Sequence, residues 1–195
     1  NWCVANKSRL KLRVINLSLG TRARDSYVTD PLCIAARQAV NAGLIVVAAA
    51  GNDGKDMLGN EIYGGIHSPG IDPSVITVGG YDDNNELGNQ ALDAYCSSFG
   101  PTLDGLLKPE IIAPAIWVAA PILPGTEAYR RAEALSQLAA APEYQLKKLA
   151  GELWREAGLP PSVQIHELPE LVAARLRESK IVATHYQHVD GTSFA

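Results

Sequence analysis

A short apolar run at residues 44–50, with Gly43 before it and Gly51 after it, constrains the fold most strongly. The run reads Leu-Ile-Val-Val-Ala-Ala-Ala, so it lacks the alternation of a strand that has one face in water. A continuous apolar run of this length is typical of a strand buried on both faces, as in a parallel sheet covered by helices. It is far shorter than the roughly 20 residues that a membrane-spanning helix needs.

Strand and helix signals alternate along the first part of the chain. Further strand candidates are residues 12–19, 75–78 and 111–118. A helix is expected before residues 44–50, because Thr29 or Asp30 can serve as its N-cap and Pro31 fits its first turn. Gly43 supplies its C-terminal stop. This order of strand, helix and strand predicts an α/β fold.

The composition changes beyond about residue 127, where alanine, leucine and charged residues dominate and strand signals are missing for about thirty residues. Apolar residues recur there at helical spacing, which predicts one amphipathic helix before Pro142 and a second after it. A third helix is expected from Pro169 to about Glu178. This stretch therefore differs in kind from the sheet-forming residues before it.

The charge balance excludes some classes of partner. The 195 residues include 17 Lys and Arg against 21 Asp and Glu, a net charge of −4, and these charges are scattered. Such a chain offers no basic surface for nucleic acid or for an anionic membrane. Its three cysteines are too few for a disulfide framework, and its first residues lack the apolar stretch of a signal peptide.

Six short motifs follow one another along the chain in a recognisable order. They are Ile15-Asn-Leu-Ser-Leu-Gly20, Ala48-Ala-Ala-Gly-Asn52, Pro73-Ser-Val-Ile-Thr-Val-Gly-Gly80, Ser97-Ser-Phe-Gly-Pro101, Lys108-Pro-Glu-Ile-Ile-Ala-Pro114 and Gly191-Thr-Ser-Phe-Ala195. Together they closely resemble the subtilisin-like serine proteases. The resemblance implies a three-layer, doubly wound α/β fold with a mostly parallel sheet, here incomplete. It assigns residues 1–126 to the core, 127–182 to an inserted helical subdomain and 183–195 to the nucleophile segment that returns to the core.

Ser193 matches the nucleophile of the family, and Asn52 matches the side-chain donor of its oxyanion hole. A serine hydroxyl at the start of a helix lies beside backbone N–H groups, and an amide N–H can reach an oxyanion without titrating. Each residue also has a simpler interpretation. Thr192 and Ser193 suit an ordinary helix N-cap, and Asn52 lies in a strong turn signal after a strand.

Two further segments resemble the substrate-binding parts of the family. The residues concerned are Ser18, Leu19, Gly20, Ala49, Ala50 and Gly51. The first three match the segment that pairs with the extended substrate backbone, and the last three match one wall of the pocket for the residue preceding the cut. The alternative is that both segments are only sheet core and strand end. Thr21 stands where the family often has a second glycine, which leaves the local path there open.

The general base and the acid of a catalytic triad are missing from the matched motifs. In the family both precede the nucleophile, and none of His67, His166, His185 and His188 lies in a matching motif. His185 and His188 precede Ser193 closely, but their segment matches the strand that leads to the nucleophile. Two histidines three residues apart also make a weak metal motif, so surface histidines are the better interpretation. We expect the chain by itself to be inactive.

No cofactor is required by this reading, and no metal ligand is assigned. Subtilisin-like proteases commonly bind calcium, so calcium is possible by family resemblance. Asp82, Asp83, Asn84 and Asn85 offer oxygen ligands after a strand. Their spacing matches no defined ion loop, and a solvated turn is the simpler interpretation.

The resemblance implies a serine endopeptidase acting on polypeptide substrates through an acyl-enzyme on Ser193, in an extracellular or cell-envelope location. The alternative is a non-catalytic module, derived from a protease, that binds a protein partner through the helical insertion. Within an enzyme, the insertion is either a lid over the substrate's leaving side or a packing and dimer contact. As cut here, the chain is also expected to self-associate, because a parallel sheet needs both faces covered.

Overall fold

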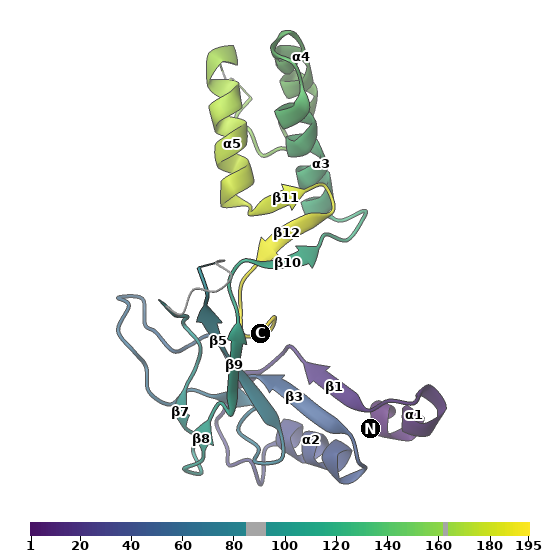
Figure 1. Ribbon diagram of the computed structural model, residues 1–195, viewed down its shortest axis with the longest axis vertical. Helices are drawn as coiled ribbons and strands as arrows, with labels where there is room; N and C mark the ends of the chain where they lie inside the picture. Colours follow the sequence, from purple (N-terminus) through teal and green to yellow (C-terminus); the bar gives the residue numbers. More distant parts are fainter. Residues whose placement is uncertain (85–92, 162–163) are drawn as a thin grey trace. The chain divides into compact units, whose positions relative to one another are not determined.

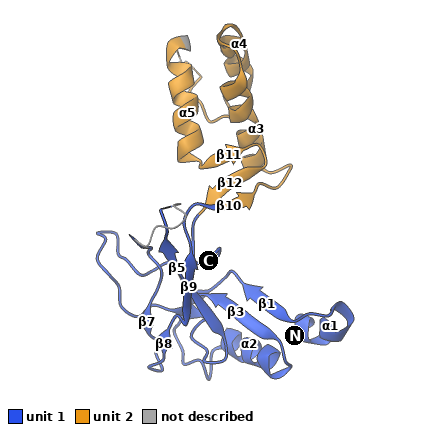
Figure 2. Ribbon diagram, viewed as in Figure 1, with its two compact units in different colours: residues 1–118, 190–195 blue, residues 119–189 orange. Residues whose placement is uncertain are grey.

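The computed structural model describes residues 1–84, 93–161 and 164–195. The chain divides into two compact units (Figure 2). The larger consists of Asn1–Val118 and Asp190–Ala195, and the smaller of Ala119–Val189. Both chain termini therefore belong to the larger unit, and the last six residues rejoin it after the smaller unit has been completed.

The larger unit is built on a mostly parallel sheet (Figure 1). Its parallel strands are β1 (Val14–Leu17), β3 (Ile45–Ala49), β5 (Ile76–Asp82) and β9 (Ile111–Pro114). They pair in the order β1-β3-β5, and β9 also pairs with β5, as does the short antiparallel strand β6 (Asp93–Ala94). Residues 44–50 thus supply a central strand, as their apolar run predicts. The α/β fold with a parallel sheet is confirmed.

Helices cover one face of this sheet. α1 (Trp2–Leu10) and α2 (Pro31–Asn41) contribute to a core that includes Ile15, Val46 and Ala48. On the opposite face, the side chains of Val14, Ile45, Ile76 and Ile111 are exposed. Among the described residues only one of the two expected helical layers is therefore present, which is the incompleteness that the motifs imply. Sequence reasoning missed α1, which has no fully buried residue.

The expected strand at residues 111–118 is in fact two strands. β9 ends at Pro114, and β10 (Val118–Pro121) follows after a break. Within the break, Trp117 has a φ of 58°, a left-handed conformation that interrupts an extended chain. The remaining short strands of the larger unit form two antiparallel ribbons. They are β2 (Thr21–Arg22) with β4 (His67–Ser68), and β7 (Gly100–Pro101) with β8 (Leu107–Lys108).

Of the two N-cap candidates, Thr29 and Asp30, it is Asp30 that caps α2. Its Oδ1 accepts hydrogen bonds from the backbone N–H of Leu32 at 2.8 Å and of Cys33 at 3.0 Å, and Pro31 occupies the first turn. The same oxygen accepts the hydroxyl of Ser68 at 2.7 Å. Burial raises the pKa of the Asp30 carboxyl, but these hydrogen bonds outweigh burial and hold it below its usual value. One carboxylate therefore caps α2 and holds β4 beside it.

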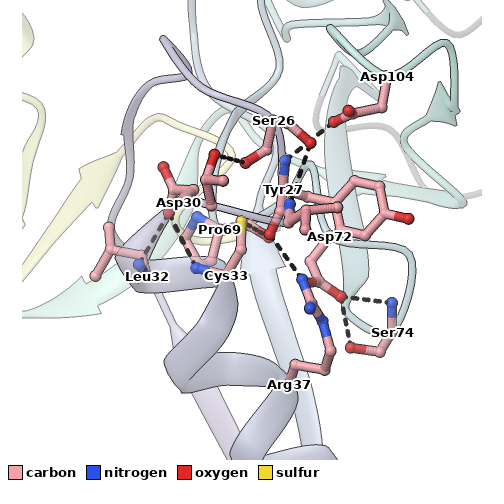
Figure 3. Close-up of polar contacts among 12 residues, drawn as sticks. Ser26, Tyr27, Asp30, Leu32, Cys33, Arg37, Pro69, Asp72, Ser74 and Asp104 are labelled. Carbon is pink, nitrogen blue, oxygen red and sulfur yellow. Dashed lines mark hydrogen bonds and ion pairs between the residues drawn. The ribbon is translucent and has the colours of Figure 1, made fainter.

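A second buried carboxylate fixes the loop that follows β4 (Figure 3). Asp72, fully buried, accepts hydrogen bonds from Arg37 Nε at 3.1 Å and from Ser74 Oγ at 2.6 Å. Arg37 also donates to the carbonyl of Tyr27 at 2.7 Å. The buried Lys108 adds bonds from its Nζ to two carbonyl oxygens in this loop region. The polypeptide after β4 is thus bound to α2 on one side and to β8 on the other.

The smaller unit has its own hydrophobic core, formed mainly by helices. The three expected helices are present as α3 (Glu127–Ala140), α4 (Glu143–Leu153) and α5 (Leu168–Glu178), with a 3-10 turn, η1 (Ile165–Glu167), before α5. Its buried residues include Leu135, Leu138, Leu146, Leu168 and Val172. A small sheet in the order β10-β12-β11, with β11 (Ile181–Ala183) and β12 (Tyr186–Val189), completes the unit. Of this sheet, the family resemblance implied only a strand at the segment of His185 and His188, and sequence reasoning missed the pairing of β12 with β10 and β11.

None of the helices within the described ranges is both long enough and apolar enough to cross a membrane.

Replacing Asp30 with alanine should lower the free energy of unfolding by about 1–2 kcal/mol, because α2 loses its cap. Urea denaturation of Asp30→Ala, beside the exposed Asp25→Ala as a control, measures this difference. Since the pKa of Asp30 is lowered in the folded state, its ionic contribution is present above its unfolded pKa of about 3.9 and is lost as pH falls through the folded value. If Asp30→Ala and Asp25→Ala lowered the free energy of unfolding by the same amount, the Asp30 cap would contribute nothing to stability.

Candidate active site

A cavity of about 370 Å³ in the larger unit brings distant segments together. It is lined by Leu19, Gly20, Ala49, Gly51, Asn52, Asp53, His67, Thr192 and Ser193. Most of the residues that the motifs single out are in this list. The other two lie next to it in the chain: Ser18 precedes Leu19, and the fully buried Ala50 follows Ala49. The cavity thus lies at the carboxyl end of β3, where an open α/β sheet commonly binds ligands.

Gly51 permits the close packing at this end of β3. It has a φ of 107°, and a Cβ built on it would lie only 2.7 Å from the ring of His67 and 2.9 Å from Ser98 Oγ. Ser98 fixes the following turn on both sides of Asn52, because its N–H donates to Gly51 O at 2.8 Å and its Oγ accepts from Asp53 N at 3.2 Å. Only glycine fits at position 51, so this turn holds Asn52 in a defined place.

Thr192 joins the last segment of the chain to this turn. Its side chain is buried, and its Oγ1 accepts the N–H of Gly51 at 3.2 Å and donates to Asn52 Oδ1 at 3.0 Å. Its backbone N–H donates to the same oxygen at 3.0 Å. Two neighbouring bonds complete the attachment, from Gly191 N to Ala115 O at 2.8 Å and from Ser18 Oγ to Ser193 O at 2.7 Å. Hydrogen bonds from the ends of β1, β3 and β9 therefore fix the position of Ser193.

Asn52 and Ser193 both line the cavity, and the hydrogen bonds of Asn52 decide which end of its amide can act there. Because Asn52 Oδ1 accepts two hydrogen bonds from Thr192, its Nδ2 is left as the donor, and no partner for Nδ2 is found among the described residues. This nitrogen lies 3.5 Å from the point where a Cβ on Gly191 would stand. Ser193 is half-buried. An amide donor thus lies against Gly191, the glycine that begins the turn of residues 191–194, here called the serine turn.

Three residues that sequence reasoning did not assign to the site form a charged cluster at the cavity. Asp53 Oδ2 bonds to Arg22 Nε at 2.8 Å and to His67 Nε2 at 2.9 Å. Arg22 and His67 face each other in the β2–β4 ribbon. The hydrogen bond from Arg22, followed by that from His67, holds the pKa of the Asp53 carboxyl below its usual value. Only the place of Asp53, directly after Asn52, gave a signal in the sequence.

The other candidate histidines lie outside this cavity. His166 and His185 are exposed, and His185 packs its ring against that of Tyr129 at 5.4 Å between centroids. Both belong to the smaller unit, as does His188. Among the proposed calcium ligands, Asn84 donates its N–H to Asp82 Oδ1 at 2.8 Å, and Asn85 lies outside the described residues. Within residues 1–84, 93–161 and 164–195 no group of three or more metal-ligating side chains was found.

A sequence profile of the subtilase family matches residues 4–195. The chain belongs to the subtilase family, which consists of serine proteases. The match confirms the resemblance seen in the six motifs. It also runs through the helical stretch that those motifs leave out.

This subtilase chain is similar to two curated relatives, over part of their length. Serine protease AprX of Bacillus subtilis is 38% identical over 121 residues, which are 59% of this chain and 26% of AprX. Pyrolysin of Pyrococcus furiosus is 34% identical over 123 residues, which are 52% of this chain and 8% of pyrolysin. The chain therefore spans about a quarter of the first relative and less than a tenth of the second.

Solved structures similar to this chain are proteases as well. The S41 psychrophilic protease is 26% identical, with a TM-score of 0.44 over 61% of this chain and 37% of that one. The prenylagaramide maturation protease PagA is 18% identical, with a TM-score of 0.43 over 91% of this chain and 55% of that one. The nisin leader peptidase NisP of Lactococcus lactis is 20% identical, with a TM-score of 0.39 over 100% and 47%.

Replacing Thr192 with valine should loosen the turn at Gly51, because valine keeps the shape of threonine but removes the hydroxyl that joins the two segments. Losing one net hydrogen bond costs about 1 kcal/mol, so hydrogen exchange of the Gly51 amide should be about fivefold faster. Thr192→Ser retains the hydroxyl and should exchange nearly as slowly as the wild type. Equal exchange in all three proteins would show that the Thr192 hydroxyl does not hold the turn.

Proposed function

We propose that this chain carries the nucleophile and the oxyanion donor of a serine endopeptidase. Ser193 Oγ attacks the scissile carbonyl carbon while a general base takes its hydroxyl proton, and the carbonyl π electrons move onto oxygen. The protonated base then gives this proton to the leaving amine as the tetrahedral species collapses, which leaves an acyl-enzyme on Ser193 that water hydrolyses. The observation that carries the proposal is the Thr192 linkage, because it holds Ser193 and Asn52 at one cavity.

Asn52 is the proposed donor to the oxyanion. Its Oδ1 is held by Thr192, so Nδ2 cannot turn away without breaking two hydrogen bonds. A donor fixed in this way needs no reorganisation when negative charge develops on the carbonyl oxygen. Its available N–H, beside the serine turn, supports this role better than the interpretation of Asn52 as an ordinary turn residue.

The substrate backbone is proposed to lie between two segments of the cavity. Residues 18–20 directly follow β1 and are exposed to solvent. Residues 49–51 are the last residue of β3 and the two that follow it. An extended peptide placed there can pair its main chain with these segments, which gives affinity with little demand on most substrate side chains. This supports a polypeptide substrate.

The general base is proposed to come from residues outside this chain. His67 is the one histidine that lines the cavity, yet its Nε2 bonds to Asp53, and no hydrogen bond joins it to Ser193 in the described part of the chain. A general base must reach the hydroxyl that it deprotonates. The 195 residues by themselves are therefore proposed to be inactive, and the complete protein, extracellular or in the cell envelope, to be active.

Ser193 should be the residue that a fluorophosphonate probe labels in the complete protein, and Ser193→Ala should abolish both labelling and peptide hydrolysis. The isolated 195-residue chain should show no protease-like turnover, because it lacks the base. Mass spectrometry of the labelled peptide and a chromogenic peptide assay measure these outcomes. Labelling that persists in Ser193→Ala contradicts the assignment of Ser193. A complete wild-type protein that is neither labelled nor active favours the alternative of a non-catalytic module that binds a partner.

Asn52→Ala should lower kcat in the complete protein with little change in KM, because the amide acts mainly on the transition state. Removing the donor of this kind in subtilisin itself lowers kcat by about 10²–10³, and the same range is expected here. Steady-state kinetics measure the effect, and circular dichroism checks that the variant is folded. An Asn52→Ala protein with full kcat would reduce Asn52 to a turn residue.

A further inference from the structure

A second cavity belongs entirely to the smaller unit and shares no residue with the proposed active site. Its volume is about 290 Å³, at the lower end of the range of roughly 300–1,000 Å³ that is usual for small-molecule sites. It therefore suits a group about as large as one residue. Its lining includes Arg131 and Leu135 of α3, Ala157 and Gly158 after α4, and Arg175 and Glu178 of α5.

Part of the wall of this cavity is apolar. Leu135 and Ala157 both have no exposed surface and belong to the hydrophobic core of the smaller unit. Beside them, no atom lies within 4 Å of the point where a Cβ on Gly158 would stand, so the chain leaves space there. An apolar group that enters the cavity can therefore bury its surface against Leu135 and Ala157.

The rest of the wall carries more positive than negative charge. Arg175 Nη1 bonds to Glu178 Oε2 at 2.7 Å, and Arg131 Nη2 bonds to Glu127 Oε1 at 3.0 Å. Glu127 does not line the cavity, and its side chain is 80% exposed, so water weakens its attraction for Arg131. Two guanidinium groups thus line the cavity against one carboxylate, which favours an anionic ligand.

Arg175 also has a hydrogen-bond donor that the fold does not use. Among the buried side-chain nitrogen and oxygen atoms of the described residues, only Arg175 Nε lacks a partner. A buried donor without a partner is unfavourable, and a planar guanidinium can bind a carboxylate through two N–H groups at once. A ligand oxygen beside Arg175 can supply the missing bond.

These features together favour one kind of anion. Arginine binds carboxylate and phosphate equally well in geometry, but inorganic phosphate would leave the apolar wall in contact with water. Glu178 repels a ligand that is only an anion, whereas it can accept a hydrogen bond from a ligand N–H. The last residue of a peptide that ends in leucine or valine offers all three groups: a carboxylate, an apolar side chain and a backbone N–H.

We propose that this cavity binds the carboxyl-terminal residue of a peptide. Its α-carboxylate lies against Arg131 and Arg175, and its apolar side chain lies against Leu135 and Ala157. The inference goes beyond the proposed function, because it assigns to the helical insertion a binding site that contains neither the proposed nucleophile nor the proposed oxyanion donor. Binding there does not depend on catalysis.

A short peptide that ends in leucine and carries a fluorescent dye at its amino end tests the site. The complete protein with Ser193→Ala is used, so that the peptide is not hydrolysed. Fluorescence anisotropy should show saturable binding. Amidation of the carboxyl end should weaken binding at least tenfold, because it removes the charge. Glycine in place of the last leucine should weaken it about tenfold, because less apolar surface is buried.

Arginine variants in the same protein locate the site. Arg175→Gln should weaken binding about tenfold, and Arg131→Gln about threefold to fivefold, the range for an exposed ion pair. Arg177→Gln and Arg130→Gln are the matched controls, because each removes an exposed arginine from the same helix without touching the lining of the cavity. Both controls should bind the peptide unchanged. Because Arg131 is exposed, Arg131→Gln keeps the test decisive even if Arg175→Gln does not fold.

Three results would overturn the site. The first is equal affinity for the free acid and its amide, and the second is equal affinity in Arg131→Gln and Arg130→Gln. The third is an amidated peptide with an internal aspartate that binds as tightly as the free acid, because the cavity would then recognise acidic side chains. Competition by inorganic phosphate should be weaker than by N-acetyl-leucine, and equal competition would contradict the role of the apolar wall.

Fluorophosphonate labelling separates this site from the proposed active site. With Ser193 present, Arg131→Gln should be labelled as fast as the wild type, while its affinity for the leucine peptide falls. Slower labelling in the folded variant would connect Arg131 with the catalytic residues and overturn the assignment of a separate site.

Discussion

The buried hydroxyl of Thr192 is the contact on which the arrangement of the site depends. It accepts from the N–H of Gly51 and donates to Asn52, so the end of β3 and the last segment of the chain are held together through one side chain. A buried hydroxyl without hydrogen-bond partners is unfavourable. The two bonds of the Thr192 hydroxyl therefore stabilise both the turn after β3 and the segment that carries Thr192. The linkage also decides which end of the Asn52 amide remains a donor beside Ser193.

The parallel sheet provides the surroundings that this linkage needs. β1 and β3 run side by side, so Ser18 and the turn at Gly51 lie at the same edge of the sheet. Ser18 bonds to the carbonyl of Ser193, and Ala115, just after β9, bonds to the N–H of Gly191. Three strand ends thus fix one short segment. A scaffold of this kind holds the proposed nucleophile and the proposed donor at a fixed distance from each other.

Much of the fold and part of the site could be predicted from local patterns. The apolar run of β3 and the stop at Gly43 depend on neighbouring residues only, so the sequence was sufficient for them, and it narrowed the cap of α2 to Thr29 or Asp30. The motifs around Asn52 and Ser193 led to the subtilase family for the same reason. The helix α1 was missed because it has no fully buried residue and so no clear apolar face. The pairing of β10, β11 and β12 was missed because short strands with half-exposed residues carry little periodicity.

The sequence by itself determined the strand-helix-strand order, the family and the two residues, Asn52 and Ser193, that match its chemistry. The tertiary structure decided what surrounds them. Arg22 and His67 come to Asp53 only because β2 pairs with β4, and Ser68 reaches Asp30 only because the loop after β4 folds against α2. Such contacts join residues far apart in the chain through backbone pairing and packing. No local pattern encodes them, and for that reason the charge at the cavity was visible only in the folded chain.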